Sequence, residues 1–287
     1  MILVTHIDLD GVGCQLVAKW FYPDLSNVYN LDYDVVDKEV RKLLEKTDEK
    51  IMIADVSINQ ETAEYAIENY PDRIELFDHH KTAQEFLGQY DWALINLESS
   101  ATKILFEELS RRNPDVKISE GLKKLVFHVN DHDLWIHESK ESKKYNDMLF
   151  MLGIKEFANI MEQRIAKNKD LMDQADKRYL RGLSHTKQGY IQAKIKQARV
   201  HNNRLVVLAS KHISELCDYI RRMKNPPREW KDIDYVDVVN LEQSCHSLRS
   251  YNQDFDVSKI AKENGGGGHP KAAGYPINLT KNFVLQF

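Results

Sequence analysis

Cysteine is scarce in this sequence of 287 residues. Its three cysteines, Cys14, Cys217 and Cys245, form no CxxC pair and leave one thiol over if two are bridged. This excludes a disulfide scaffold and a cysteine-rich zinc site. Free thiols suit a reducing compartment, and we therefore expect a cytoplasmic protein.

Long apolar runs are also missing. No stretch approaches the roughly 20 apolar residues that a membrane-spanning helix needs. The apolar residues 2–4 follow no basic segment and end at His6, so they predict a first strand and not a signal peptide. We therefore expect no membrane segment.

An excess of positive charge is lacking as well, since the net charge is −4. This argues against a protein that coats long nucleic acids by charge alone, because that mode needs a basic surface. Residues 181–231 nevertheless hold twelve Lys and Arg against three acids, a local net charge of +9, and the rest of the chain carries −13. The basic stretch is suited to phosphates, although an ordinary solvated face explains it equally well.

The N-terminal half alternates short apolar runs with segments of helical spacing. The strand-like runs are 2–4, 28–31, 51–54, 74–77 and 92–95, and the helical segments are 11–20, 38–46, 59–69 and 100–112. Ser57 and Gln60 have the spacing of a capping box for the third helix. The alternation predicts an α/β fold with a doubly wound, mostly parallel sheet.

The chain length favours two domains. We predict a catalytic domain over 1–154, a helical linker over 155–183 with an apolar stripe from Phe157 to Tyr179, and a smaller α/β domain over 184–287. The last range begins after Gly182 with strand-like residues 205–209, helical residues 212–224 and strand-like residues 235–239. We expect the two domains to face each other across a cleft.

Acidic and histidine side chains follow three of the predicted strands. They lie in the segments His6-Ile7-Asp8-Leu9-Asp10, Ala54-Asp55 and Asp78-His79-His80. Each aspartate alone is a normal helix N-cap. Because the carboxyl ends of parallel strands line one crevice, the whole set should converge there, and so many carboxylates would repel one another without cations. Carboxylates combined with imidazoles suit Mn²⁺, and Mg²⁺ less well.

A fourth acidic segment, 130–135, ends a helical stretch and offers a further carboxylate for a second metal. Asp131 and Asp133 are the two carboxylates in this segment. His128, His132 and His137 are interpreted as surface or helix-end residues.

These four segments resemble the four motifs of the DHH phosphoesterases, in the same order and at strand ends. The segments 247–250 and 265–274, which contain Arg249 and four consecutive glycines, resemble the accompanying DHHA1 domain. The resemblance spans nearly the whole chain and is strongest to the nano-RNase or oligoribonuclease branch. It implies a hydrolase that cleaves phosphodiester bonds.

The resemblance also implies residue roles. The first metal would be held by His6, Asp8 and Asp55, and the second by Asp10, the bridging Asp55, His79 and Asp131. For the fourth motif, the family's motif spacing favours Asp131, with Asp133 as the open alternative. His80 would face the phosphate, and Asp78 would orient a histidine.

The glycine run has a physical interpretation of its own. Consecutive glycines are costly in chain entropy, so they are expected where backbone approaches a ligand closely or adopts positive φ. Backbone N–H groups there are suited to a phosphate, and Arg249 to a bidentate phosphate contact. The residues expected to bind substrate are Arg249, Ser250, Gly266, Gly267, Gly268 and His269.

We therefore expect a two-Mn²⁺ phosphodiesterase that hydrolyses short RNA or DNA oligonucleotides to 5′-mononucleotides. Alternatives are an enzyme for linear or cyclic dinucleotides, a phosphatase for 3′-phosphoadenosine-type nucleotides, and a nucleotide-binding module that has lost catalysis. RNA or DNA preference, polarity, substrate length and oligomeric state stay open, with a homodimer among the alternatives.

Overall fold

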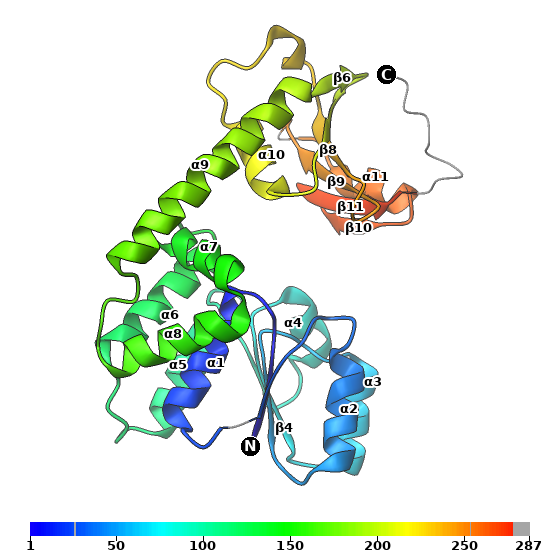
Figure 1. Ribbon diagram of the computed structural model, residues 1–287. Coiled ribbons are helices and arrows are strands. Elements are labelled where there is room, and N and C mark those ends of the chain that lie inside the picture. Colours follow the sequence, from blue (N-terminus) through cyan, green and yellow to red (C-terminus); the bar gives the residue numbers. More distant parts are fainter. Residues whose placement is uncertain (26, 253, 278–287) are drawn as a thin grey trace. The chain divides into compact units, whose positions relative to one another are not determined.

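The computed structural model describes residues 1–25, 27–252 and 254–277, and the chain divides into two compact units, Met1–Leu180 and Arg181–Phe287. The first unit contains a five-stranded parallel sheet in the order β2-β1-β3-β4-β5 (Figure 1). Its strands are β1 (Ile2–Thr5), β2 (Asn27–Asn30), β3 (Ile51–Ala54), β4 (Ile74–Asp78) and β5 (Ala93–Ile95). The predicted parallel α/β sheet is confirmed.

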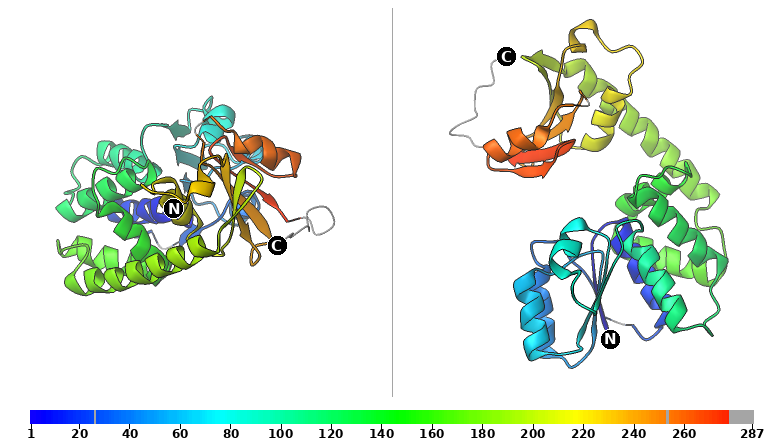
Figure 2. Two further views of the ribbon diagram at one scale, coloured as in Figure 1. Left: turned by 90° about the horizontal axis from the view of Figure 1, so that it is seen from above. Right: turned by 180° about the vertical axis from the view of Figure 1, so that it is seen from behind.

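Helices cover both faces of this sheet (Figures 1 and 2). On one face lie α2 (Val36–Lys46), α3 (Gln60–Asn69) and α4 (Lys81–Leu87). On the other lie α1 (Leu9–Phe21) and α5 (Ala101–Arg112), with α6 (Glu120–Asp133), α7 (Ser142–Leu152) and α8 (Ile154–Ala166) packed outside them. The apolar residues of β1 and β3 are buried between these layers, as Ile2, Val4, Ile51 and Ile53 show.

Two local features differ from the sequence prediction. The N-cap of α3 is Asn59, whose side chain accepts a hydrogen bond from the Thr62 N–H, so the capping box predicted at Ser57 is wrong. Asn is as good an N-cap as Ser, and its position two residues later sets the helix start. The short helix α4 was not predicted.

The second unit contains a six-stranded mixed sheet in the order β10-β11-β9-β8-β7-β6. Among the ladders that the described residues form in this second sheet, only the β7–β8 pair is parallel. The elements are α9 (Gln174–Gln197), β6 (Arg199–His201), β7 (Arg204–Leu208), α10 (Ile213–Arg221), η1 (Arg228–Trp230), β8 (Tyr235–Asn240), β9 (Cys245–Ser250), α11 (Val257–Glu263), β10 (Gly267–His269) and β11 (Ala272–Pro276).

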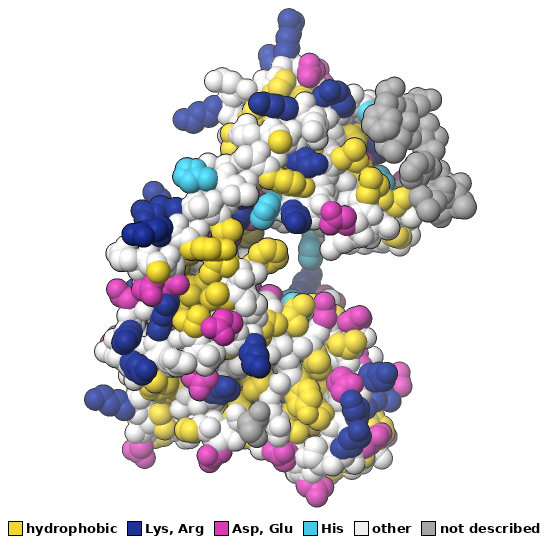
Figure 3. Space-filling model, viewed as in Figure 1, with side chains coloured by type: hydrophobic (Ala, Val, Ile, Leu, Met, Phe, Trp, Pro, Cys, Tyr) yellow, Lys and Arg dark blue, Asp and Glu magenta, His cyan; other side chains and the backbone are white. Residues whose placement is uncertain are grey.

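Helix α9 and α10 pack on one face of this sheet around Leu205, Val207 and Val238, and α11 packs on the other face around Leu248. Lys and Arg side chains predominate over acidic ones on the face of this unit that Figure 3 shows. This agrees with the positive charge of residues 181–231.

The division after Leu180 falls inside α9. The predicted linker, 155–183, covers α8 and the beginning of α9, and four of its apolar stripe residues, Phe157, Met161, Ile165 and Met172, are buried. The fifth, Tyr179, is exposed. The boundaries at 154 and 184 stay predictions, and the end of the predicted C-terminal domain, 278–287, lies outside the described residues.

Within the described ranges, no helix combines the length and the apolar character that crossing a membrane requires.

Candidate active site

The strands β1, β3 and β4 are neighbours, and their carboxyl ends carry most of the predicted site residues. Strand β1 has β2 on one side and β3 on the other, so the strand order reverses between β1 and β3. In open parallel sheets, ligands bind at the carboxyl ends of the strands beside such a switch point. Side chains from three strand ends therefore meet above β1 and β3.

Asp8 serves two purposes at the start of α1. Its Oδ1 accepts a hydrogen bond from the Gly11 N–H at 3.0 Å and caps the helix. Its Oδ2 lies 3.0 Å from His6 Nδ1. Gly11 permits this tight turn, because a Cβ at residue 11 would lie 2.3 Å from the His6 carbonyl oxygen. One oxygen of Asp8 thus shapes the fold and the other faces the cluster.

Asp55 occupies the centre of the cluster. Its side chain is almost completely buried and its φ is 61°, a conformation that few residues other than glycine adopt. Oδ2 lies 3.9 Å from His6 Nδ1, and Oδ1 lies 3.4 Å from His79 Nε2. Burial, together with the charges of Asp10 and Asp8, raises the pKa of Asp55 well above its usual value.

The second group of side chains surrounds His79 Nε2. Asp10 Oδ2 lies 3.7 Å from this nitrogen and Asp133 Oδ2 lies 3.4 Å from it. The N-terminus of α5 holds Asp10 in place, because the N–H groups of Ala101 and Thr102 donate to its two oxygens at 2.7 and 2.9 Å. Burial and the neighbouring Asp10 and Asp8 raise the pKa of Asp133 to about 8.

Asp131, which motif spacing favoured over Asp133, does not point into the cluster. Its carboxylate accepts hydrogen bonds from the N–H groups of Glu138 and Ser139, at 2.7 and 3.1 Å, and so holds the segment after α6. Two residues along a helix correspond to a rotation of about 200°, so Asp131 and Asp133 lie on opposite sides of α6. The structure therefore favours Asp133, and the preference for Asp131 is corrected.

Asp78 is buried and orients His80. Its Oδ1 accepts from His80 Nδ1 at 2.7 Å and from the His79 N–H at 2.7 Å. On the other side of the ring, His80 Nε2 lies 3.2 Å from the Tyr33 hydroxyl. The predicted pairing of Asp78 with a histidine thus corresponds here to His80.

Sequence reasoning missed Tyr33 and Asp32, which follow β2. The Tyr33 ring lies 4.8 Å from the His6 ring, and Asp32 Oδ1 lies 3.7 Å from His6 Nε2. A signal was available, because β2 ends at the same sheet edge as β1 and β3. Applying the strand-end rule to β2 would have identified both residues.

The donor atoms fit divalent cations. Potential ligand atoms lie within 4.8 Å of one another in three groups: His6, Asp8 and Asp55; Asp10, His79 and Asp133; and Asp55, Asp78, His79 and His80. Four buried atoms, His6 Nδ1, Asp55 Oδ2, Asp78 Oδ2 and Asp133 Oδ2, find no hydrogen-bond partner among the described residues. Unpaired buried acceptors are costly, and a cation satisfies several at once. Carboxylate oxygens combined with imidazole nitrogens are ligands that Mn²⁺ accepts.

Metal binding should release protons near neutral pH. With a pKa of about 8, the Asp133 carboxyl retains its proton there in metal-free protein, whereas ligation requires the carboxylate. Affinity for Mn²⁺ should rise with pH up to about 8, where Asp133 loses its proton. Titration calorimetry in two buffers with different ionisation enthalpies would show different apparent enthalpies at pH 7, and equal values would contradict the expectation.

The C-terminal sheet brings together two predicted substrate-binding residues. Across three neighbouring strands, Arg249 of β9 pairs with Ala272 of β11, which pairs with His269 of β10. Directly opposed residues in a ladder share a face, so Arg249 and His269 lie on the same side of the sheet. Arg249 also approaches the hydroxyl of Ser214 in α10, at 3.4 Å.

Ser250 lies on the other face, since successive strand residues alternate, and its hydroxyl donates to the Asn252 carbonyl. The structure thus does not bring Ser250 together with Arg249 and His269, and Ser247 shares their face instead.

The glycine run does not form a free loop. Gly267 and Gly268 belong to the edge strand β10, and Gly266 directly precedes it. A Cβ at Gly266 would lie 2.0 Å from the Gly274 carbonyl oxygen, and one at Gly268, where φ is 130°, would lie 2.6 Å from Ala273 Cα. Gly267 has no such neighbour. Gly266 and Gly268 therefore permit close backbone packing, and Gly267 leaves space beside Arg249 and His269.

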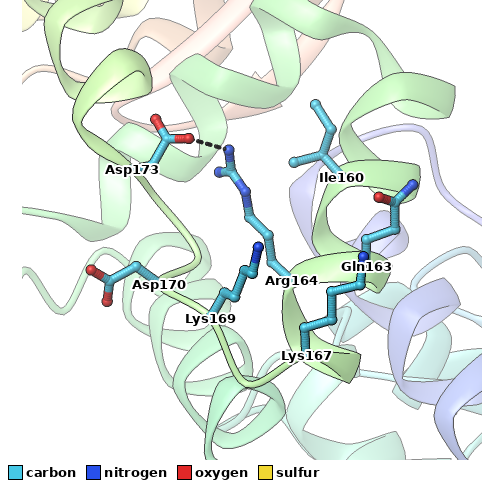
Figure 4. Close-up of a pocket in the computed structure, with 7 residues that line it drawn as sticks. All are labelled: Ile160, Gln163, Arg164, Lys167, Lys169, Asp170 and Asp173. Carbon is cyan, nitrogen blue, oxygen red and sulfur yellow. Dashed lines mark hydrogen bonds and ion pairs between the residues drawn. The ribbon is translucent and has the colours of Figure 1, made fainter.

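A surface pocket of about 550 Å³ lies at the end of α8 and the loop before α9 (Figure 4). None of the Asp and His residues grouped at the strand ends lines this pocket. Arg164, which lines it, donates to the Leu171 carbonyl at 2.9 Å and to Asp173 at 2.9 Å, and it also bonds Asp176. These contacts connect α8 to α9, so the pocket is explained by chain packing.

Comparisons with known proteins agree with this site. No family model matches the chain. Oligoribonuclease NrnB of Bacillus subtilis is 32% identical over 301 residues, which cover 96% of this chain and 72% of that protein. Among solved structures, a pGpG-specific phosphodiesterase of Vibrio cholerae has a TM-score of 0.57 at 13% identity and covers 97% of this chain and 93% of its own.

The exonuclease RecJ bound to manganese also has a TM-score of 0.57, at 14% identity, with 96% of this chain and 85% of that chain covered. At these low identities the two structures support the fold, and the family is established by the NrnB relationship. Together with the Asp and His cluster at the strand ends, this relationship shows that the chain belongs to the DHH family of phosphoesterases.

Proposed function

We propose that the protein is a manganese-dependent phosphodiesterase that hydrolyses oligonucleotides of a few residues to 5′-mononucleotides. The observation that carries the proposal is the position of Asp55 between two groups of ligand atoms, with one oxygen toward His6 and the other toward His79. A pair of divalent cations is the arrangement that in-line displacement at phosphorus uses. The related protein that covers most of the chain is named an oligoribonuclease.

Two Mn²⁺ ions, or Mg²⁺ less well, would be held by six residues, of which Asp55 would contribute to both ions. His6, Asp8 and Asp55 would hold the first, and Asp10, Asp55, His79 and Asp133 the second. When bound, the pair would supply an activated water at neutral pH and stabilise charge on the attacking and leaving oxygens.

The protein's own residues would position the substrate. His80, oriented through Nδ1 by Asp78, presents Nε2 at the edge of the cluster, where it would donate to a phosphate oxygen. Burial of Asp78 favours its hydrogen bond to His80 and fixes the ring. The hydrogen bonds from α5 keep Asp10 in one orientation, which limits reorganisation during the reaction.

The C-terminal sheet would bind the terminal nucleotide. Arg249 and His269 share one face, where Gly267 leaves the surface open, and both side chains are suited to a phosphate.

Arg249→Ala and His269→Ala should each lower kcat/KM for short substrates about 10- to 150-fold. This range corresponds to the roughly 1.5–3 kcal/mol of a charge-assisted hydrogen bond. Metal content should not change. Suitable controls are Arg199→Ala and His201→Ala on the opposite edge strand β6, where Arg199 also donates to a neighbouring carbonyl at 2.9 Å. Wild-type kinetics in both test variants would show that this face does not bind substrate.

The profile of kcat/KM against substrate length tests the function. A substrate needs one nucleotide for the C-terminal sheet and one phosphodiester for the acidic cluster, so efficiency should be high at two to five nucleotides and flat or falling beyond. Longer substrates would gain only screened contacts with the basic stretch 181–231, which high salt removes.

The assay should include Mn²⁺, labelled oligonucleotides, cyclic dinucleotides and 3′,5′-bisphosphates. A steep and salt-resistant rise with length would indicate a processive exonuclease. Preference for a cyclic dinucleotide or a bisphosphate would replace the proposed substrate, and absence of any product would indicate a binding module.

A further inference from the structure

Helix α6, which carries Asp133, ends in a Schellman motif. The Trp135 N–H donates to the His132 carbonyl at 3.2 Å, and the Ile136 N–H donates to the Asp131 carbonyl at 3.1 Å. In this motif the residue after the helix cap takes the left-handed conformation, and glycine is the usual choice there. This chain has Trp135 at that position, with a φ of 53°.

A tryptophan at this position costs free energy, and the side chain has little burial to offset that cost. Left-handed backbone disfavours a bulky side chain, and 57% of the residue stays exposed. Its ring neighbours are two histidines, His132 with centroids 6.2 Å apart and His137 at 5.0 Å. Strained residues of this kind concentrate at functional sites.

The position of Trp135 relates it to the acidic cluster. It lies two residues after Asp133, whose Oδ2 is 3.4 Å from His79 Nε2. The segment that follows is held at Glu138 and Ser139 by the buried Asp131 carboxylate. Both sides of Trp135 are therefore fixed, so stacking on its ring would cost little conformational entropy.

We propose that Trp135 is a stacking platform for a nucleobase of the substrate, next to the phosphodiester at the acidic cluster. This inference rests on the proposed function. An indole ring offers a flat face to any base, so the contact would bind substrate with little base preference. Trp135 would act in substrate recognition, and the cluster would carry the chemistry.

Trp135→Ala should lower kcat/KM for a natural dinucleotide about 5- to 150-fold, the range for one base–aromatic stack. Two further dinucleotides lack one base, either at the 5′ or at the 3′ residue. The kcat/KM of wild-type protein should fall by a similar factor on one of these two abasic substrates. On that abasic substrate, Trp135→Ala should lose little more, and Trp135→Phe should retain most activity on the natural one. Phe127→Ala, an exposed aromatic earlier in α6, is the control.

Two measurements separate recognition from a structural role. Trp135→Gly should unfold at the same temperature as wild type or higher, because glycine suits the left-handed position. A clear fall in its Tm, or equal loss of activity by Trp135→Ala on natural and abasic substrates, would overturn the proposal.

Fluorescence gives a readout that does not depend on turnover. A dinucleotide with a methylphosphonate linkage, which resists hydrolysis, should quench the exposed Trp135, and the quench should disappear in Trp135→Phe. Quenching without hydrolysis of the natural dinucleotide would contradict the proposed function alone. Hydrolysis with an unaltered quench in Trp135→Phe would contradict the stacking role alone.

Discussion

Asp55→Asn should abolish activity and at the same time make the metal-free protein more stable. Asp55 is the residue that both ligand groups share, so losing it removes several kcal/mol of metal-derived stabilisation and lowers kcat by at least about 1000-fold. Asparagine has nearly the same size and tolerates the φ of 61° at this position. It removes a buried carboxyl from the neighbourhood of Asp8 and Asp10.

The gain in stability should be about 1 kcal/mol, or a Tm roughly 2–4 °C higher. Because folding raises the pKa of Asp55, its cost to the folded state begins above the unfolded pKa of about 4 and increases as pH rises toward the folded pKa. The gain should therefore be larger at pH 8 than at pH 5.

Calorimetric titration with Mn²⁺ and thermal unfolding with a chelator present would test this expectation. Asp72→Asn is a matched control, because Asp72 also has a φ of 61° but is an exposed turn residue before β4. A variant Asp55→Asn that still binds two Mn²⁺ per chain would contradict the bridging role.

Asp133→Asn and Asp131→Asn should have opposite effects. Asp133→Asn should reduce Mn²⁺ affinity and lower activity by about 100-fold or more, with no loss of stability, because this carboxyl faces His79 and is destabilised by its acidic neighbours. Asp131→Asn should reduce activity only several-fold. It should lower the Tm by roughly 3–12 °C, because it weakens two charge-assisted hydrogen bonds worth about 1.5–3 kcal/mol together.

The two variants serve as controls for each other, since they make the same substitution two residues apart in one helix. Metal content, kcat/KM and Tm should be measured for both. If Asp131→Asn lost metal and kept its Tm, while Asp133→Asn kept its activity, the ligand would be the residue that motif spacing favoured.

Local sequence patterns are enough to predict the strands of the N-terminal sheet and the candidate ligands at their ends. The apolar runs at 2–4, 51–54 and 74–77 correspond to β1, β3 and β4, because buried parallel strands need continuous apolar residues. Once these strands are parallel, their carboxyl ends share an edge, so residues such as Asp8, Asp55 and His79 must come close together. Strand pairing joins residues that are distant in the sequence, but the local patterns are enough to predict which side chains it brings to this edge.

Which side of an element faces the site depends on packing between distant segments, and local patterns do not report it. Asp131 and Asp133 are equally available in the sequence, and the rotation of α6 against the sheet selects Asp133. The register of β9 against β11 places Arg249 with His269 and leaves Ser250 on the opposite face. Tyr33 reaches His80 across 47 residues of sequence, and no local period reports such a contact. Local periodicity specifies an element and its buried side, whereas packing against distant segments specifies which polar side chains meet.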